Sequence, residues 1–265
     1  MSEPIRLARP DVGEAELAAV AEVVSTGMLT MGPKVGELEC ALAGACGTAD
    51  AVVVSSGTAA LHLAVMALGI GPGDEVIVPA YTFPATANVV ELCGARAVIV
   101  DVDPDTFNLD LSRVADAVTS RTKAVLAVHL FGRPVEWEVL QTAVPQEVAL
   151  VEDAAGALGA CYRGTPCGSL GLMGCLSFHP RKIVTTGEGA PSRPTSPSSP
   201  TRSGSSATTA SPRAATSTSL RPASTTGCRT SSARSGSLRW RASSSCSPRA
   251  SGWRAGTRSV SNISC

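Results

Sequence analysis

Apolar residues recur with regular periods through the first 190 positions of the chain, and this patterning then stops. Residues 14–25 carry leucine and valine at the three- and four-residue spacing of an amphipathic helix. Residues 59–68 predict a second helix, which follows a Ser-Ser-Gly-Thr turn. Short apolar, β-branched runs predict strands at 51–54, 75–78, 97–100, 124–128 and 148–151.

Helices and strands alternate in this region, which indicates an α/β fold with a mostly parallel sheet covered on both faces. Such sheets bind their ligands beyond the carboxyl ends of the strands. The polar and glycine-rich segments of this chain follow predicted strands. We therefore expect the functional residues to meet at that edge of the sheet.

The last third of the chain has a different composition. Lys plus Arg and Asp plus Glu both total 22, yet no acidic residue follows Glu188, and residues 191–265 hold 11 Arg and 23 Ser. We predict two parts, an incomplete α/β domain at 1–189 and a disordered Ser-, Arg- and Pro-rich segment at 190–265. A basic nucleic-acid-binding tail is the alternative, but its arginines are not clustered, so we expect no nucleic-acid partner.

Two further patterns limit the location and the chemistry. There is no run of 18 apolar residues and no signal-peptide pattern, so we expect no membrane partner. The nine cysteines form no CxxC pair, so we expect no metal site. A reducing, cytoplasmic location fits this cysteine usage best.

Candidate chemistry begins at the turn before the helix at 59–68. Gly57 and Thr58 open this helix, where free backbone N–H groups at the positive end of the helix dipole can hold a phosphate. An ordinary helix cap gives the same pattern. Phe83, after the strand at 75–78, either stacks on a flat cofactor or packs in the core.

Asp153 and Lys182 are the two candidate catalytic residues. Asp153 ends a buried strand, where an acid needs a cation such as a pyridinium nitrogen, although helix capping is an equal alternative. Lys182 is one of three lysines before residue 190, and a desolvated lysine amine is a nucleophile toward an aldehyde. A solvated surface lysine is the alternative. His179 lies next to this segment and is a better site candidate than His129.

Six stretches, taken together and in order, resemble the DegT/StrS family of sugar aminotransferases, which depend on pyridoxal phosphate (PLP). They are SSGTAALHLA, GPGDEVIVPAYTFPATAN, VDVDPDTFNLD, TKAVLAVHLFG, VEDAAGALGA and GCLSFHPRKIVTTGEG, and they cover nearly all of residues 25–189. The resemblance implies a fold-type-I large domain, similar to that of aspartate aminotransferase, and usually a homodimer. The carboxy-terminal small domain of that fold is not recognisable here.

The resemblance also implies roles for the matching residues. Lys182 would hold PLP covalently, and Asp153 would pair with its pyridine nitrogen. Transfer of an amino group from glutamate or glutamine to a keto sugar is implied, usually on a nucleotide-linked sugar made for polysaccharides or secondary metabolites. Related sugar dehydratases carry His at the position of Lys182, so the lysine favours transamination.

The remaining cofactor contacts are implied in the same way. Phe83 would stack on the ring, and the phosphate would be held by Gly57, Thr58 and Ser177. One position departs from the family pattern, because Gly156 stands where a glutamine commonly bonds the 3′ oxygen of PLP. The loss of that side chain would change the pKa of the covalent link between Lys182 and PLP.

The resemblance ends near residue 189, and we interpret the following segment as the product of a shifted reading frame. Ala223–Thr230, with each codon begun one base earlier, is compatible with Gly-Phe-Asn-Tyr-Arg-Leu-Thr-Asp. That string resembles a family segment whose Asn reaches the cofactor phosphate of the neighbouring subunit. On this hypothesis the chain also lacks the strand after Gly189 and folds poorly, and an inactive remnant is the alternative to an active enzyme.

Overall fold

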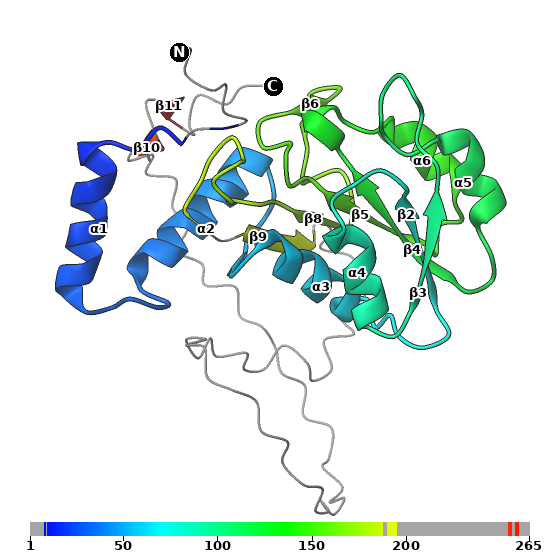
Figure 1. Cartoon of the computed structure of the whole chain (residues 1–265), viewed down its shortest axis with the longest axis horizontal. Coiled ribbons are helices and arrows are strands. Elements are labelled where there is room, and N and C mark those ends of the chain that lie inside the picture. Colours follow the sequence, from blue (N-terminus) through cyan, green and yellow to red (C-terminus); the bar gives the residue numbers. More distant parts are fainter. Residues whose placement is uncertain (1–7, 9, 188–189, 195–253, 256–257, 260–265) are drawn as a thin grey trace, which may run out of the picture. The chain divides into compact units, whose positions relative to one another are not determined.

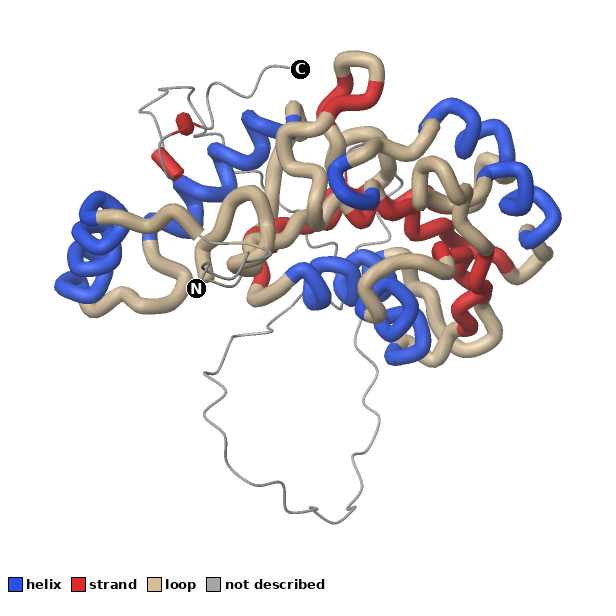
Figure 2. Tube along the Cα trace, turned by 45° about the horizontal axis from the view of Figure 1, so that its top comes forward, coloured by secondary structure: helices blue, strands red, loops and turns tan. Residues whose placement is uncertain are grey.

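A seven-stranded sheet lies at the centre of the chain, with helices on both of its faces (Figures 1 and 2). The computed structural model describes residues 8, 10–187, 190–194, 254–255 and 258–259. The helices are α1 (Glu14–Thr26), α2 (Pro33–Cys46), α3 (Gly57–Ala67), α4 (Ala85–Leu92), α5 (Leu111–Ala117) and α6 (Trp137–Ala143), with a 3-10 turn at Leu130–Gly132.

The strands of the sheet are β1 (Val53–Val54), β2 (Glu75–Pro79), β3 (Arg96–Val100), β4 (Thr122–Val128), β5 (Ala149–Asp153), β8 (Met173–Cys175) and β9 (Ala190–Pro194). Two antiparallel ribbons complete the described elements, β6 (Cys161–Tyr162) with β7 (Thr165–Pro166) and β10 (Arg254–Ala255) with β11 (Arg258–Ser259).

The strand order in the sheet is β1-β9-β8-β5-β4-β2-β3. The pairs β3–β2, β2–β4, β4–β5 and β5–β8 are parallel, and β9 is antiparallel to both of its neighbours. The predicted α/β fold with a mostly parallel sheet is therefore confirmed. Each strand that the sequence predicts is present, within two residues of its predicted ends.

The prediction that the chain lacks the strand after Gly189 is wrong. In β9, Arg193 lies opposite Gly174 of β8 and Pro191 lies opposite Val53 of β1. Strand pairing uses backbone groups that every residue except proline supplies in full, so a segment without an apolar pattern can still close a ladder. The predicted boundary at 189 thus falls inside the sheet, whereas Ala223–Thr230 lies outside the described residues.

The sheet is covered on both faces because its strands are apolar on both faces. Val76 and Val78 of β2 pack with α3 and α4, whereas Ile77, between them, packs on the opposite face with α5 and α6. This alternation follows from the two-residue period of a strand. Strands buried on both faces are typical of parallel sheets, as the sequence predicted.

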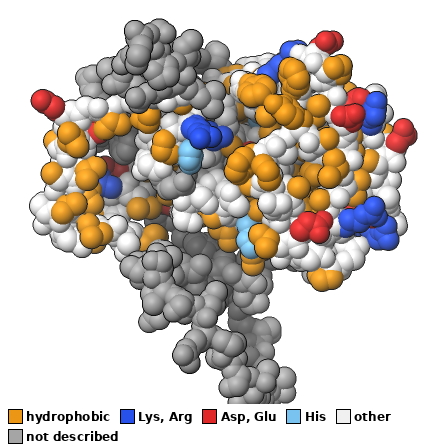
Figure 3. All heavy atoms as spheres, in the orientation of Figure 1, with side chains coloured by type: hydrophobic (Ala, Val, Ile, Leu, Met, Phe, Trp, Pro, Cys, Tyr) orange, Lys and Arg blue, Asp and Glu red, His pale blue; other side chains and the backbone are white. Residues whose placement is uncertain are grey.

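Helix α1 confirms the predicted helix but not the burial of its apolar side. Leu17, Val20 and Val24 are 66%, 61% and 60% exposed, and no residue of α1 is buried. Hydrophobic side chains are also spread among scattered charges on the face drawn in Figure 3. Within the described part of the chain, no helix is long and apolar enough to cross a membrane.

Candidate functional site

The carboxyl ends of β2, β4, β5 and β8 lie at one edge of the sheet, because these strands run parallel. Phe83 follows β2, Asp153 ends β5, and Ser177 and Lys182 follow β8. Helix α3 begins with Gly57, beside the segment after β8. These segments therefore follow the carboxyl ends of the parallel strands.

Gly57 and Ser177 lie in direct contact. A Cβ atom added to Gly57 would lie 3.0 Å from the Cβ of Ser177 and 3.3 Å from its Oγ. The Oγ of Ser56 caps α3 by accepting the N–H of Ala59 at 3.1 Å. Thr58 is exposed at the start of the same helix, whose first backbone N–H groups have no partner within the helix.

Asp153 is a buried carboxylate, 5% exposed, with partners on both oxygens. Its Oδ2 accepts the hydroxyl of Thr86 at 2.8 Å, and its Oδ1 accepts the N–H of Ala155 at 3.2 Å. Burial raises the pKa of Asp153, and these two hydrogen bonds and the charge of Lys182 oppose that rise. Burial thus disfavours the charged form of this acid.

Lys182 lies on a turn close enough to Asp153 for the two charges to interact. Its N–H donates to the carbonyl of His179 at 2.8 Å, and its side chain is half-buried. The Nδ1 of His179 accepts the N–H of Arg181 at 3.2 Å, so the predicted site histidine braces the turn that carries the lysine. Lys182 is thus neither fully solvated nor part of the core.

Phe83 is 73% exposed, so the alternative of a core aromatic residue is wrong. Near it along the chain, Tyr81 forms an exposed cluster with Phe107 and Phe131, whose ring centroids lie 5.9 to 6.5 Å apart. Phe107 and Phe131 have φ angles of 60° and 54°, which are unusual for residues other than glycine. Such backbone strain, here at Phe107 and Phe131, is typical of functional sites.

Glu152, on the opposite face of β5 from Asp153, is the centre of a buried network. Its Oε1 and Oε2 accept the N–H groups of Gly168, Leu170 and Gly171 at 2.6 to 2.8 Å. His129 contributes a fourth bond through Nε2 at 2.9 Å, and its Nδ1 accepts the N–H of Val135. Since Nδ1 is an acceptor, Nε2 carries the proton and donates it to Glu152.

Neither the contact of Thr86 with Asp153 nor the role of Glu152 was predicted from the sequence. Thr86 stands three residues after Phe83 in the first turn of α4, but no spacing rule places that turn over the end of β5. Glu152 was visible as an acid inside an apolar strand, which demands buried partners. Its partners are backbone N–H groups, which a sequence pattern does not identify.

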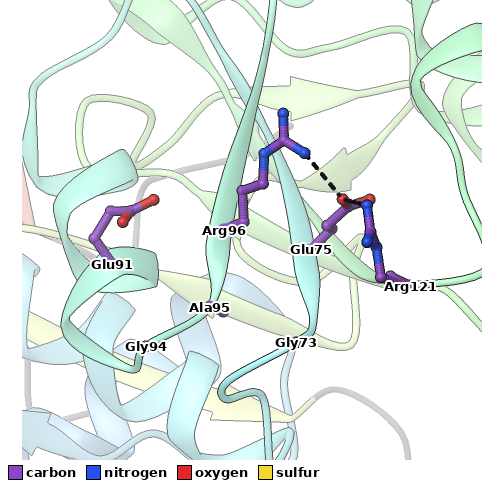
Figure 4. A pocket seen from close by; sticks show the side chains of 7 residues that line it. All are labelled: Gly73, Glu75, Glu91, Gly94, Ala95, Arg96 and Arg121. Atoms are coloured by element: carbon purple, nitrogen blue, oxygen red, sulfur yellow. Dashed lines mark hydrogen bonds and ion pairs between the residues drawn. The ribbon is translucent and has the colours of Figure 1, made fainter.

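A cavity of about 320 Å³ lies at the opposite edge of the sheet (Figure 4). In it, Arg96 and Arg121 both reach the carboxylate of Glu75, at 3.4 and 2.6 Å. The hydrogen bond from Thr119 and these guanidinium groups lower the pKa of Glu75. The cavity lies at the amino ends of the strands, where Glu75 begins β2 and Arg96 begins β3, so it is separate from the candidate site. The lining residues are Gly73, Glu75, Glu91, Gly94, Ala95, Arg96 and Arg121.

No group of three or more His, Cys, Asp or Glu side chains within the described residues could hold a metal ion. The groups that the candidate site offers are a helix start, a buried carboxylate, a lysine and exposed aromatic rings.

Comparison with known proteins gives concordant matches. Residues 10–190 match the model of the DegT/DnrJ/EryC1/StrS aminotransferase family. GDP-perosamine synthase of Caulobacter vibrioides is 46% identical over 187 residues, which are 70% of this chain and 50% of that protein. The chain spans about half the length of the relatives it matches.

Two solved structures show the same fold. The PLP form of a sugar aminotransferase from Streptococcus pneumoniae is 36% identical, with a TM-score of 0.71 over 72% of this chain and 53% of that one. A mutant GDP-4-keto-6-deoxymannose-3-dehydratase with bound GDP-perosamine is 32% identical, with a TM-score of 0.69 over 72% and 51%.

Proposed function

The chain belongs to the DegT/DnrJ/EryC1/StrS aminotransferase family, and from that premise we propose that it is a PLP-dependent aminotransferase acting on a nucleotide-linked keto sugar. One observation carries the proposal. The structure brings the Gly57–Ser177 contact, the buried Asp153 and the half-buried Lys182 to a single edge of the sheet. These groups suit the phosphate, the ring nitrogen and the aldehyde of PLP in their chemistry.

The residues fit PLP on structural grounds. The absent Cβ at Gly57 lets Ser177 approach the start of α3, where amide groups and the Ser177 hydroxyl suit a phosphate. Asp153 is a buried acid, and its burial raises its pKa. A protonated pyridine nitrogen would supply a positive charge beside it.

When bound, PLP supplies an electron sink for the pair of electrons left on a carbon that loses its proton. Lys182 would hold the cofactor covalently through Nζ, and the released amine would then take the proton from the amino-bearing carbon. Asp153 would keep the ring nitrogen charged, and Phe83 would cover one face of the ring. Gly57, Thr58 and Ser177 would anchor the phosphate.

The proposed substrates are an amino donor, glutamate or glutamine, and a keto sugar carried on a nucleotide. The names of two similar proteins support the sugar, since one is a GDP-perosamine synthase and the other holds GDP-perosamine. Lys182, rather than histidine, supports amination over dehydration. We place this reaction in the cytoplasm, in polysaccharide or secondary-metabolite biosynthesis, and expect a homodimer.

An amination assay tests the proposal. The full chain is incubated with PLP, glutamate and GDP-4-keto-6-deoxymannose, and the nucleotide sugar is followed by mass spectrometry. We expect a product in which an amino group replaces the keto oxygen, and none with Lys182→Ala. A chain that binds PLP but leaves several nucleotide-linked keto sugars unchanged would contradict the substrate class.

A second candidate is an inactive remnant, which the composition of residues 195–253 favours, since it departs from the acid-containing pattern before it. The nucleotide sequence around codon 189 tests the shifted frame behind this candidate. Family-like sequence that continues in another frame would support it. An open frame that encodes residues 190–265 with nothing family-like beside it would contradict it.

A further inference from the structure

Thr86 is a fully buried hydroxyl residue at the start of α4, with 0% exposure. Its Oγ1 lies 2.8 Å from Oδ2 of Asp153 and 3.0 Å from Oγ1 of Thr82. Its backbone N–H also donates to the carbonyl of Phe83 at 3.1 Å. Thr86 therefore connects the segment that carries the exposed aromatic ring to the buried acid.

The directions of these hydrogen bonds follow from the number of protons. A hydroxyl has one proton to donate, and an ionised carboxylate can only accept. Thr86 therefore donates a hydrogen bond to Asp153, and the oxygen of Thr86 accepts a hydrogen bond from the hydroxyl of Thr82. Both hydrogen bonds in the series Thr82–Thr86–Asp153 therefore point toward the aspartate. This arrangement requires Oδ2 of Asp153 to be a hydrogen-bond acceptor.

We propose that Thr86 is a positioning residue for Asp153, fixing the carboxylate as an oriented, charged acceptor, and that Thr82 aligns Thr86. The proposal rests on the proposed function, in which Asp153 faces the ring nitrogen of PLP. Neither threonine touches the cofactor in this account. Both act through the position and charge of the aspartate.

The surroundings of Asp153 give the two threonines this importance. Burial opposes the charged form of the acid, and the Ala155 N–H supplies a longer bond, 3.2 Å, on the other oxygen. The ionisable side chains near enough to act on Asp153 are Lys182 and His129. The Nε2–H of His129 is donated in a hydrogen bond to Glu152, so this ring does not donate to Asp153. Among the described side chains, Thr86 makes the short hydrogen bond to this carboxylate, so its removal weakens the charged form most directly.

Carbon-13 NMR of the Asp153 carboxyl in the cofactor-free full chain tests this, with Asp153→Asn to assign the signal. Thr86→Val keeps the shape and removes the hydroxyl, and we expect the titration midpoint to move to higher pH. Thr86→Ser restores the midpoint, and Thr82→Val moves it less, in the same direction. Thr119→Val is the control, since that hydroxyl bonds Glu75 instead. An unchanged midpoint in folded Thr86→Val overturns the proposal, and if that variant does not fold, an unchanged midpoint in Thr82→Val does so.

Cofactor binding provides a separate measurement. Thr86→Val is expected to bind PLP about tenfold more weakly, the loss expected for one hydrogen bond to a charged group, and Thr86→Ser to bind normally. Equal affinities in Thr86→Val and the unsubstituted chain would also overturn the proposal. A chain that binds no PLP contradicts the proposed function, whereas the carboxyl titration still decides the role of Thr86.

Discussion

Gly57 and Ser177 meet so closely that a single methyl group on the glycine would lie 3.0 Å from the Cβ of the serine. The two residues are 120 positions apart, one at the start of α3 and the other just after β8. Their contact sets the distance between the helix amides and the serine hydroxyl. In the proposed enzyme this distance decides how the phosphate is held.

Gly57→Ala tests this contact. Since the added carbon must push the Ser177 segment away by a few tenths of an ångström, we expect PLP affinity to fall about tenfold, equivalent to about 1.4 kcal/mol. Gly36→Ala is the matched control, because it lies in α2 with no atom near the new carbon. Titration of PLP followed by absorbance measures both, and equal affinities would contradict the assigned phosphate position.

Asp153→Asn tests the burial of the acid through the pH dependence of stability. Burial raises the pKa of Asp153, so the folded chain binds the proton of this carboxyl group more tightly than the unfolded chain does. The resulting stabilisation is complete below about pH 4, the ordinary range of an unfolded aspartate, and is lost as pH rises through the raised value.

We therefore expect the cofactor-free Asp153→Asn chain to melt at a higher temperature than the unsubstituted chain at neutral pH. The difference should shrink as pH falls toward 4, near the ordinary pKa of aspartate. Thermal unfolding at several pH values measures it. A pH-independent difference would show that Asp153 has the same pKa in the folded and unfolded chains, which contradicts a raised pKa.

The sequence predicted the sheet but not the contacts across it. Apolar runs predicted β2, β4 and β5, because a strand buried on both faces is apolar along most of its length. Two of the features that the sequence did not predict have no pattern along the chain. β9 pairs through its backbone, and Thr86 reaches Asp153 only because α4 packs over the sheet.

The site residues divide in the same way. Lys182 and Asp153 could be found because a lysine or an acid beside an apolar strand is chemically unusual. The positive φ angles of Phe107 and Phe131 could not, since phenylalanine does not favour that conformation in any sequence pattern.

Glu152→Gln tests the buried network behind the site. The amide NH₂ of glutamine would face a backbone N–H that Glu152 now accepts, leaving a buried donor without a partner. We expect the free energy of unfolding to fall by about 3 kcal/mol. Glu138→Gln, an exposed partner of Arg163, is the control and should change stability little. Denaturant unfolding compares them, and similar losses in both would refute the network's importance.

Gly156→Gln tests the departure from the family pattern. A Cβ at Gly156 meets no atom within 4 Å and the position has no positive φ, so the side chain fits without strain. If glutamine bonds the 3′ oxygen of PLP, it stabilises negative charge there, and the spectral transition of the bound cofactor should move to lower pH. An absorbance titration in both chains measures this. An unchanged transition would mean that the position does not face the cofactor.

Covalent attachment of PLP to Lys182 is the central claim, and borohydride reduction followed by peptide mass spectrometry tests it most directly. We expect an absorption band at about 420 nm, as cofactor chemistry requires, and a reduced pyridoxyl group on the peptide that contains Lys182. Lys182→Ala should lose both, while Lys123→Ala keeps both. A pyridoxyl group on Lys34 or Lys123 instead, or a band that survives Lys182→Ala, would contradict the account.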